Sequence, residues 1–512
     1  MCGIFAYLSN DENVDRETLK HNGMKSRHRG PDKTNEVCIQ TKNNFNYFLF
    51  HRLSINGLNE KSDQPMKLNG NDNHVLLCNG EIYNYRELAQ EYNINLETDS
   101  DCEIILHLYK RLHVSKFIKQ LDGVFSFLIY DKYTNQVIVG HDPFGIRPLY
   151  YSHVDTEIIF SSEMKCLTEL TNEIQFYPPG SFSLIDLNHL EMKTFSYYQF
   201  KYETIKEKDE TKIINTLKSK LEKAVQKRLL ADRPIGCLLS GGLDSSVITS
   251  IVCQLLGPEN VRTFAIGLDG SPDLASAQKV ADYLGTNHTN IVVSETEMLE
   301  SIDETIYQIE SHDTTTVRAS VPMFLLSKYI RTNTNIKVIL SGEGSDEASG
   351  SYLYFHNAPS PNAFSAECLR LIKDVRYFDV LRGDKTTAGW GLELRVPFFD
   401  KEFMDYYMGI PPEKKMVRDG MEKYLLRMAF VNDLPKEIVW RRKDGFSDGV
   451  SQFEKPWYEI INEYTQKVHQ CTEKEYYLKT FQKYYPKQEN IIPYEWMPKW
   501  SEQENPSGRL LI

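Results

Sequence analysis

The stretch Ser240-Gly241-Gly242-Leu243-Asp244-Ser245-Ser246 is the part of this sequence that most strongly indicates a fold. It follows a short apolar run, residues 235–239, that predicts a buried strand. It opens a predicted helix whose apolar side chains recur with a period of about 3.6 residues, at Val247, Ile248, Ile251, Val252 and Leu255. Two adjacent glycines permit a tight turn, and the free N–H groups at a helix start attract anions. The stretch therefore predicts a phosphate site; an ordinary helix cap after a tight turn is the alternative.

Outward from this stretch, predicted strands and helices alternate. The predicted strands are residues 262–268, 291–293 and 336–340, and the predicted helices include residues 273–284, capped by Asp273, and 320–330. Repeated strand–helix units indicate a parallel sheet covered by helices on both faces. Ligands bind such sheets at the carboxyl ends of the strands. The Ser240 stretch and the segment 341–347 both follow predicted strands, so we expect them at one site.

The second segment, Ser341-Gly342-Glu343-Gly344-Ser345-Asp346-Glu347, is a glycine-rich loop that carries three acids. Carboxylates beside a phosphate repel it unless a cation lies between them, so the pattern predicts Mg²⁺. A solvated acidic loop is the alternative. Four basic residues are candidates to balance the charge: Arg318, Arg382, Lys385 and Lys443.

Composition excludes several classes of protein. The 512 residues suggest two or three domains, and Lys+Arg 59 against Asp+Glu 71 gives a net charge of −12, which disfavours a nucleic-acid partner. No apolar run approaches the ~18 residues of a membrane span, and the first residues lack the basic region of a signal peptide. The nine cysteines are scattered without a C-x-x-C pair. This predicts reduced thiols in a cytoplasmic protein, with no disulfide frame and no zinc site.

The first 200 residues follow a different pattern, in which strands outnumber helices and the helices are clustered. The predicted strands are residues 47–50, 74–78, 124–130, 136–139, 148–152 and 157–161. This indicates an α+β layered sandwich. Residues 201–212 are mostly polar and charged and predict a linker, followed by an amphipathic helix that begins with Ile213. We therefore place the two domains at residues 1–200 and 213–512.

Cys2 is a candidate nucleophile. Removal of Met1 would place a thiol and a free α-amino group on one residue. The α-amino pKa is about 7.7–8.0 in model peptides, so this group can act as a base near neutral pH. The alternative is a small buried cysteine with no chemical role.

The pair Asn79-Gly80 follows an apolar strand, where it would normally form a hairpin turn. Residues 86–89 look helical instead, so the Asn79 amide and the Gly80 N–H are candidates for a two-donor oxyanion hole. Further on, residues 98–101 predict the cap of a helix with Ile104, Ile105 and Leu108 on its apolar face. A capping role for Asp101 therefore stays open beside a role in binding.

Five motifs in the first half together resemble the class II glutamine amidotransferases: residues 1–4 (MCGI), 28–32 (HRGPD), 52–55 (RLSI), 79–84 (NGEIYN) and 142–150 (DPFGIRPLY). The resemblance implies a four-layer αββα N-terminal-nucleophile domain in which Cys2 attacks the side-chain amide of glutamine. It implies an oxyanion hole of Asn79 and Gly80, Arg52 on the substrate carboxylate, and Glu81 with Asp101 on its ammonium, pairings that suit these groups. The remaining residues implied at the glutamine site are Leu53, Ser54, Ile55 and Asn56.

The second half resembles the ATP-pyrophosphatase domain of the glutamine-hydrolysing asparagine synthetases. The matching stretches are residues 238–246, 264–274, 316–320, 341–347, 390–398 and 443–450. The resemblance implies a Rossmann-like α/β domain in which Glu343 assists formation of an aspartyl adenylate, beside Asp379 and Arg382. It implies Mg²⁺ on Asp244 and Asp346. The implied ATP-binding residues are Leu239, Ser240, Gly241, Gly242, Asp244, Ser245, Ser246, Ile266, Ser341, Gly342 and Lys443.

The resemblance covers essentially the whole chain and implies ATP-dependent synthesis of asparagine from aspartate and glutamine. The products would be asparagine, glutamate, AMP and pyrophosphate, formed through a Cys2 thioester and a β-aspartyl-AMP intermediate. It also implies a homodimer. At Ala348–Ser351 the chain departs from the usual Leu-Phe-Gly-Gly, which predicts thinner packing under the acidic loop. Two alternatives stay open: a β-lactam-synthetase-like enzyme that acts on another carboxylate, and a non-catalytic homologue that binds nucleotide.

Overall fold

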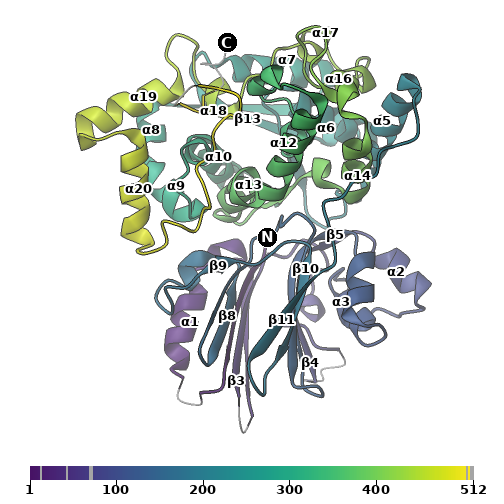
Figure 1. The fold of residues 1–512 in the computed structure, drawn as a ribbon, viewed down its shortest axis with the longest axis vertical. Helices are drawn as coiled ribbons and strands as arrows, with labels where there is room; N and C mark the ends of the chain where they lie inside the picture. Colours follow the sequence, from purple (N-terminus) through teal and green to yellow (C-terminus); the bar gives the residue numbers. More distant parts are fainter. Residues whose placement is uncertain (12–13, 42–43, 69–72, 503–504, 508–512) are drawn as a thin grey trace.

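The two halves of the chain contain different kinds of sheet (Figure 1). The computed structural model describes residues 1–11, 14–41, 44–68, 73–502 and 505–507. The first 200 residues form two antiparallel sheets, and a single parallel sheet lies in the part of the chain after residue 230. This confirms the predicted combination of an α+β sandwich with an α/β unit. Within the described residues, no helix is long and apolar enough to cross a membrane.

Two antiparallel sheets stack face to face in the N-terminal half. One has the order β2-β3-β1-β8-β7-β9 and the other β11-β10-β6-β5-β4. Alternate apolar side chains of the two sheets meet in one buried cluster, which includes Ile4, Phe48, Leu77 and Leu128. The strands are β1 Gly3–Ser9, β2 Lys33–Gln40, β3 Phe45–Arg52, β4 His74–Ile82, β5 Gly123–Asp131, β6 Gln136–His141, β7 Tyr150–Val154, β8 Glu157–Ser161, β9 Gln175–Phe176, β10 Ser181–Asp186 and β11 Glu191–Ser196.

Helices cover the outer faces of this sandwich. α1 packs against β1 and β3, and the cluster around α2, α3 and α4 covers β4 and β5. Their bounds are α1 Arg16–Met24, α2 Tyr85–Glu91, α3 Glu103–Tyr109 and α4 Val114–Phe117. The resulting layers, helix, sheet, sheet and helix, agree with the four layers that the resemblance implied.

The C-terminal sheet has the order β14-β13-β12-β15-β16, and all of its neighbouring strands are parallel. Its strands are β12 Ile235–Leu238, β13 Arg262–Leu268, β14 Asn287–Val293, β15 Val338–Leu340 and β16 Glu393–Arg395. Because β12 and β15 are adjacent, with Cys237 opposite Leu340, the loops that follow them lie side by side. The Ser240 and Ser341 segments therefore meet, as the sequence predicted.

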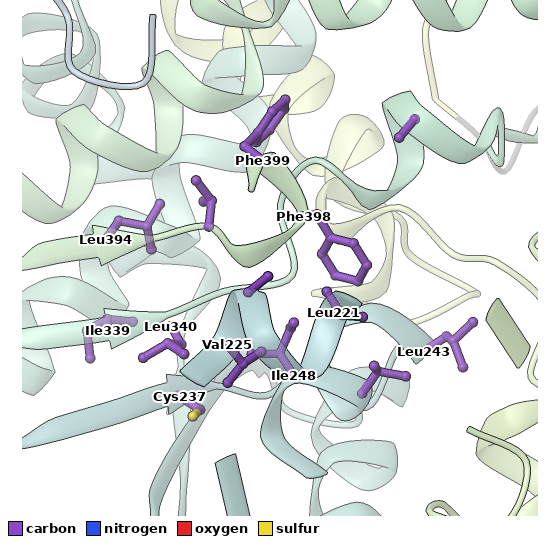
Figure 2. Packing of buried hydrophobic residues seen from close by; sticks show 14 of the residues in the cluster. Leu221, Val225, Cys237, Leu243, Ile248, Ile339, Leu340, Leu394, Phe398 and Phe399 are labelled. Carbon is purple, nitrogen blue, oxygen red and sulfur yellow. The ribbon is translucent and has the colours of Figure 1, made fainter. Parts of the chain in front are cut away.

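Helices surround this sheet, and their apolar faces form its core. Figure 2 shows Val225 from α5, Cys237 from β12, Ile248 from α6 and Leu340 from β15 gathered in that core. The helices are α5 Glu210–Lys227, α6 Leu243–Leu256, α7 Pro272–Leu284, α8 Glu295–Glu300, α9 Ile302–Ile309, α10 Thr314–Asn333, α11 Ser345–Ser349, α12 Pro361–Asp374, α13 Asp379–Ala388, α14 Lys401–Gly409, α15 Pro412–Lys415, α16 Tyr424–Ala429, α17 Lys436–Val439, α18 Phe446–Gly449, α19 Trp457–Tyr464 and α20 Glu473–Tyr484.

Several predicted boundaries and caps are wrong. Ser271, not Asp273, caps α7, because Pro272 takes the first helical position. No side chain caps α3: the Glu103 carboxylate instead accepts the N–H groups of residues 97 and 98. Asp209 caps α5, so this helix starts inside the predicted linker. Residues 79–80 form no hairpin turn, as expected, because β4 runs on to Ile82 and residues 86–89 lie in α2.

Buried ion pairs join the two halves. Arg29 Nη1 lies 2.6 Å from Glu163 and 2.8 Å from Asp384, which is on α13. Lys385, one residue further along α13, lies 3.0 Å from Glu163. The N-terminus is placed at this same boundary (Figure 1). Since removing one partner of a buried ion pair leaves an uncompensated charge, these contacts hold the halves in a defined orientation.

Candidate active sites

The Cys2 thiol lies at the start of β1, against the segment that follows β3. The Leu53 N–H donates to Cys2 Sγ at 3.4 Å, and the Cys2 N–H donates to Asn79 Oδ1 at 2.9 Å. Arg29 Nε donates to the Cys2 carbonyl at 2.8 Å. Burial raises the pKa of the Cys2 thiol to about 11. A base must therefore take the thiol proton before the sulfur can act as a nucleophile near neutral pH.

Met1 precedes this thiol and is buried between the two halves. Its amino group donates to the Leu392 carbonyl at 3.4 Å and lies 3.9 Å from the Glu393 carboxylate. Burial lowers the pKa of this amino group to about 6. As long as Met1 is present, Cys2 has no free α-amino group of its own.

Asn79 and Gly80 lie on β4 beside the thiol. Asn79 Nδ2 is buried and donates to no partner in the structure, so an amide N–H pair is available next to Cys2. Only glycine fits at position 80, because an added Cβ would lie 2.3 Å from the Val124 carbonyl oxygen. This close approach comes from the pairing of β4 with β5. A buried free donor beside a thiol is what an oxyanion hole requires.

The charged residues predicted at the glutamine site already have partners within the N-terminal half. Arg52 Nη1 lies 2.5 Å from Asp63 and donates to the Asn59 carbonyl at 3.1 Å. Glu81 accepts a hydrogen bond from Asn56, and Asp101 accepts the N–H of Ile82 at 2.6 Å. Leu53 and Ile55 are buried apolar residues, and Ser54 donates its N–H to the Asp32 carboxylate.

A cavity of about 190 Å³ lies at the carboxyl ends of β12, β13 and β15. Of the predicted ATP-site residues it is lined by Leu239, Ser240, Gly242, Asp244, Ser245, Ile266, Ser341, Gly342 and Lys443. An added Cβ on Gly342 would lie 2.8 Å from the Ser245 amide nitrogen, so this glycine lets the two loops touch. Gly241 and Ser246 are not among the lining residues. Gly241 has a φ of +71° and packs on Ser276 of α7, and Ser246 donates to the Gly242 carbonyl.

The three predicted aspartate-site residues are brought together at this cavity. Arg382 Nη2 donates to Glu343 and to Asp379, both at 2.8 Å. Burial raises the pKa of Glu343, and Arg382 opposes that rise. Tyr352, which the sequence did not single out, also lines the cavity and donates to Glu347 at 2.6 Å. One arginine thus orients two carboxylates next to the glycine–serine loops.

Asp244 and Asp346 also converge, and a lysine that the sequence analysis missed joins them. Lys423 Nζ lies 2.5 Å from Asp244 and 2.6 Å from Asp346, and Lys443 Nζ lies 2.6 Å from Asp346. Burial alone would raise the pKa of Asp346, but the two lysines hold it well below its usual range. No sequence signal marks Lys423, which directly precedes α16 and has a φ of +60°. Among the described residues, no group of three or more Asp, Glu, His or Cys side chains could hold a metal.

Two of the four basic residues predicted to balance the acidic loop do not line the cavity. Arg318 pairs with Glu473 at 2.6 Å, and Lys385 pairs with Glu163 and Glu310 at the boundary between the halves. The prediction that Arg318 and Lys385 balance the acidic loop is therefore wrong, because nearer carboxylates engage both.

The segment Ala348–Ser351 is closely packed. Ala348 is buried, and an added Cβ on Gly350 would lie 2.4 Å from the ring of Phe364. The Ser351 hydroxyl donates to the Asp346 carboxylate. The unusual residues thus help to hold one of the two acids that meet Lys423.

Two family models match the chain. A glutamine amidotransferase domain matches residues 1–198, and asparagine synthase matches residues 216–366 and 357–504. Together they extend over both candidate sites.

Curated proteins match over the full length. Proteins named asparagine synthetase [glutamine-hydrolyzing] are 38% identical in Gallus gallus, 39% in Rattus norvegicus and 38% in Homo sapiens. Each match covers 100% of this chain and 98% of the relative.

Proposed function

The chain belongs to the family of glutamine-hydrolysing asparagine synthetases, and we propose that it makes asparagine from aspartate, glutamine and ATP. The single observation that carries this proposal is the cavity in which both glycine–serine loops meet the cluster of Glu343, Asp379 and Arg382. We assign glutamine hydrolysis to residues 1–200 and asparagine formation to residues 213–512.

In the first reaction Cys2 is the nucleophile. After removal of Met1, its own α-amino group takes the thiol proton, and the thiolate attacks the side-chain amide carbon of glutamine. The Asn79 side-chain amide and the Gly80 N–H donate to the oxyanion. Ammonia leaves as the thioester forms, and water then releases glutamate. The free Asn79 Nδ2 supports this role.

We assign the residues that bind the α-ammonium and α-carboxylate groups of glutamine by charge complementarity. Glu81 and Asp101 are the acids that suit its ammonium, and Arg52 suits its carboxylate. Arg52 is held by Asp63 in the structure, so glutamine would share this guanidinium with Asp63. Leu53, Ser54, Ile55 and Asn56 form the segment against which the substrate lies.

In the second reaction the β-carboxylate of aspartate attacks the α-phosphorus of ATP, and pyrophosphate leaves. Arg382 orients the substrate acid, and Lys443 and Lys423 are positioned to neutralise phosphate charge. Glu343 lies next to the reacting carboxylate and assists formation of the adenylate. Ammonia then attacks the acyl carbon, and AMP leaves with the carboxylate oxygen.

Mg²⁺ fits the donor set of Asp244 and Asp346. Both side chains present carboxylate oxygens, which hard divalent cations prefer, and both converge on one point, now taken by Lys423 Nζ. Together with phosphate oxygens they would hold the ion. When bound, Mg²⁺ supplies charge neutralisation on the triphosphate.

Release of pyrophosphate tests the proposal. The protein is incubated with ATP, Mg²⁺ and ammonia, and one amino acid is added at a time. We expect release only with aspartate, in step with asparagine. Release with another acid would favour the β-lactam-synthetase-like alternative. ATP binding without turnover would favour a non-catalytic homologue.

We also propose a cytoplasmic location and a homodimer. All nine cysteines are free, which suits a reducing compartment. Fractionation and the mass in solution test these two points.

A further inference from the structure

β16 is an edge strand of the C-terminal sheet, and two of its three residues are charged. Glu393 and Arg395 are two positions apart, so their side chains leave the strand on one face. Charged residues on edge strands usually face water, but Glu393 is 3% exposed and Arg395 1% exposed. The N-terminal half covers them, since Arg147 Nη2 lies 3.6 Å from Glu393.

Two nitrogens of the Arg395 guanidinium, Nε and Nη1, are held by hydrogen bonds. Its Nε donates to Glu393 at 2.8 Å, and its Nη1 donates to the Arg228 and Leu230 carbonyls at 2.8 and 2.6 Å. Nη2 makes no hydrogen bond and lies 3.3 Å from the Glu81 carboxylate. A side chain from the C-terminal sheet therefore directs a buried free donor at an acid of the candidate glutamine site.

The main chain of Arg395 contacts the other site. Its carbonyl accepts the N–H of Ser341 at 3.0 Å, and Ser341 opens the loop that carries Glu343. One residue therefore joins the acidic loop of the ATP cavity to Glu81. Figure 2 shows the neighbouring Leu394 beside Ile339 and Leu340 of β15.

We propose that Arg395 is a positioning residue for glutamine, supplied by the C-terminal half, and that it couples the state of the Ser341 loop to the glutamine site. The proposal rests on the proposed function, in which Glu81 binds the ammonium of glutamine. A shift of the Ser341 loop on ligand binding moves the Arg395 carbonyl, and the guanidinium then moves relative to Glu81.

The charges around Glu81 explain how the contact with Arg395 affects its ionisation. Burial raises the pKa of Glu81 well above its usual range, Glu393 and Asp101 raise it further, and Arg395 and Arg147 lower it. The Cys102 thiol also faces this group. Loss of Arg395 removes a cation from a cluster of three carboxyl groups, so Glu81 takes up a proton more readily. Each pKa unit above the working pH lowers its ionised fraction about tenfold.

Arg395→Met and Arg395→Lys test this, with Arg228→Met as the matched control. Arg228 is also a buried arginine at the boundary, where it pairs with Asp400 at 3.0 Å and lies 4.8 Å from the Tyr83 ring. Its side chain contacts neither Glu81 nor Ser341 in the structure. For each protein we measure glutamate release against glutamine concentration between pH 6 and 9, with and without aspartate and ATP. Asparagine formation from ammonia is measured separately.

In Arg395→Met we expect the KM for glutamine to rise about tenfold or more at pH 7 and to recover at higher pH. We expect any effect of aspartate and ATP on that KM to disappear, and Arg395→Lys to restore most of the affinity. Synthesis from ammonia should stay within about twofold of wild type. Arg228→Met should keep the wild-type KM and pH profile.

The proposal fails if Arg395→Met has the wild-type KM and pH profile. It also fails if glutamate release and ammonia-dependent synthesis fall equally in both Met variants, which would indicate a purely structural role. If the wild type hydrolyses glutamine but makes no asparagine from ammonia, the proposed function fails instead, and glutamate release still tests Arg395.

Discussion

The two candidate sites differ in how their polar groups are satisfied. Beside Cys2, the Asn79 amide keeps a buried donor without a partner. In the ATP cavity, by contrast, Lys423 and Lys443 neutralise Asp244 and Asp346 within the protein itself. A free donor can donate to a substrate oxygen with no rearrangement, whereas paired charges have to exchange partners when a charged ligand enters. The oxyanion donor of the first site is thus preorganised, whereas the second site has to exchange its ion pairs on binding.

Replacing the nucleophile separates the two sites most sharply. Cys2→Ala should lower glutamine-dependent synthesis by about 10⁴-fold or more, because it removes the proposed nucleophile that forms the thioester. Ammonia-dependent synthesis should persist at the wild-type rate. Asparagine formation from each nitrogen source checks this, and loss of both reactions would contradict separable sites.

Asp244→Asn should act on the other site. Removing one of the two carboxylates that would hold Mg²⁺ should slow pyrophosphate release by about 10²- to 10³-fold. Glutamate release from glutamine is the internal control and should continue. Unchanged pyrophosphate release would remove Asp244 from the metal site.

Lys423→Met tests whether the ATP cavity depends on its internal cation. Two acids would lose a partner at 2.5–2.6 Å, so we expect unfolding to become easier by about 2 kcal/mol without ligand. Pyrophosphate release should fall about 10-fold or more. Denaturant midpoints with and without Mg-ATP measure this. A midpoint that Mg-ATP fails to raise would show lost binding, and an unchanged midpoint in both conditions would contradict the role of Lys423.

The pH dependence of glutamine use should be the smallest effect. Burial raises the pKa of Asp101 to about 6, so Asp101 loses its charge as the pH falls through 6. Since we propose that this charge binds the ammonium of glutamine, the KM for glutamine should rise at acidic pH, by up to about tenfold for each unit below 6. Asp101→Asn should show a high KM that no longer depends on this ionisation. A wild-type KM that is flat from pH 5 to 8 would exclude Asp101 from binding.

The sequence predicted correctly those elements of the fold that depend on the local pattern of residues. The spacing of the apolar residues in 235–255 and the two glycines predicted the position of the Ser240 loop correctly. A strand, a turn and a helix are all specified by residues within this stretch. The meeting of Glu343 with Arg382 was expected from the charge of the acidic loop, for which Arg382 was one of four candidates, and from the resemblance. The structure brings the two together across 39 residues of chain.

Long-range partners were harder to predict. Lys423 has no local signal, because Asp244 and Asp346 lie 77 or more residues away along the chain. The contact of Arg395 with Glu81 on β4 is likewise long-range. Arg318 and Lys385 were assigned wrongly for the same reason, since a basic residue pairs with whichever carboxylate the fold brings near. Asp273 lies in the first turn of α7 and does not cap it, because Pro272 takes the first helical position and Ser271 precedes it.

The burial of the Met1 amino group also limits the time during which Met1 can be removed. Its partner Leu392 lies 391 residues later in the chain, and at about 5–20 residues per second the ribosome needs about 20–80 s to make that interval. An aminopeptidase can reach Met1 during synthesis, but not after the C-terminal half has closed over it. A purified chain that still carries Met1 should therefore resist the peptidase until it is unfolded. On the proposed mechanism, a chain that keeps Met1 through folding cannot hydrolyse glutamine for as long as it remains folded.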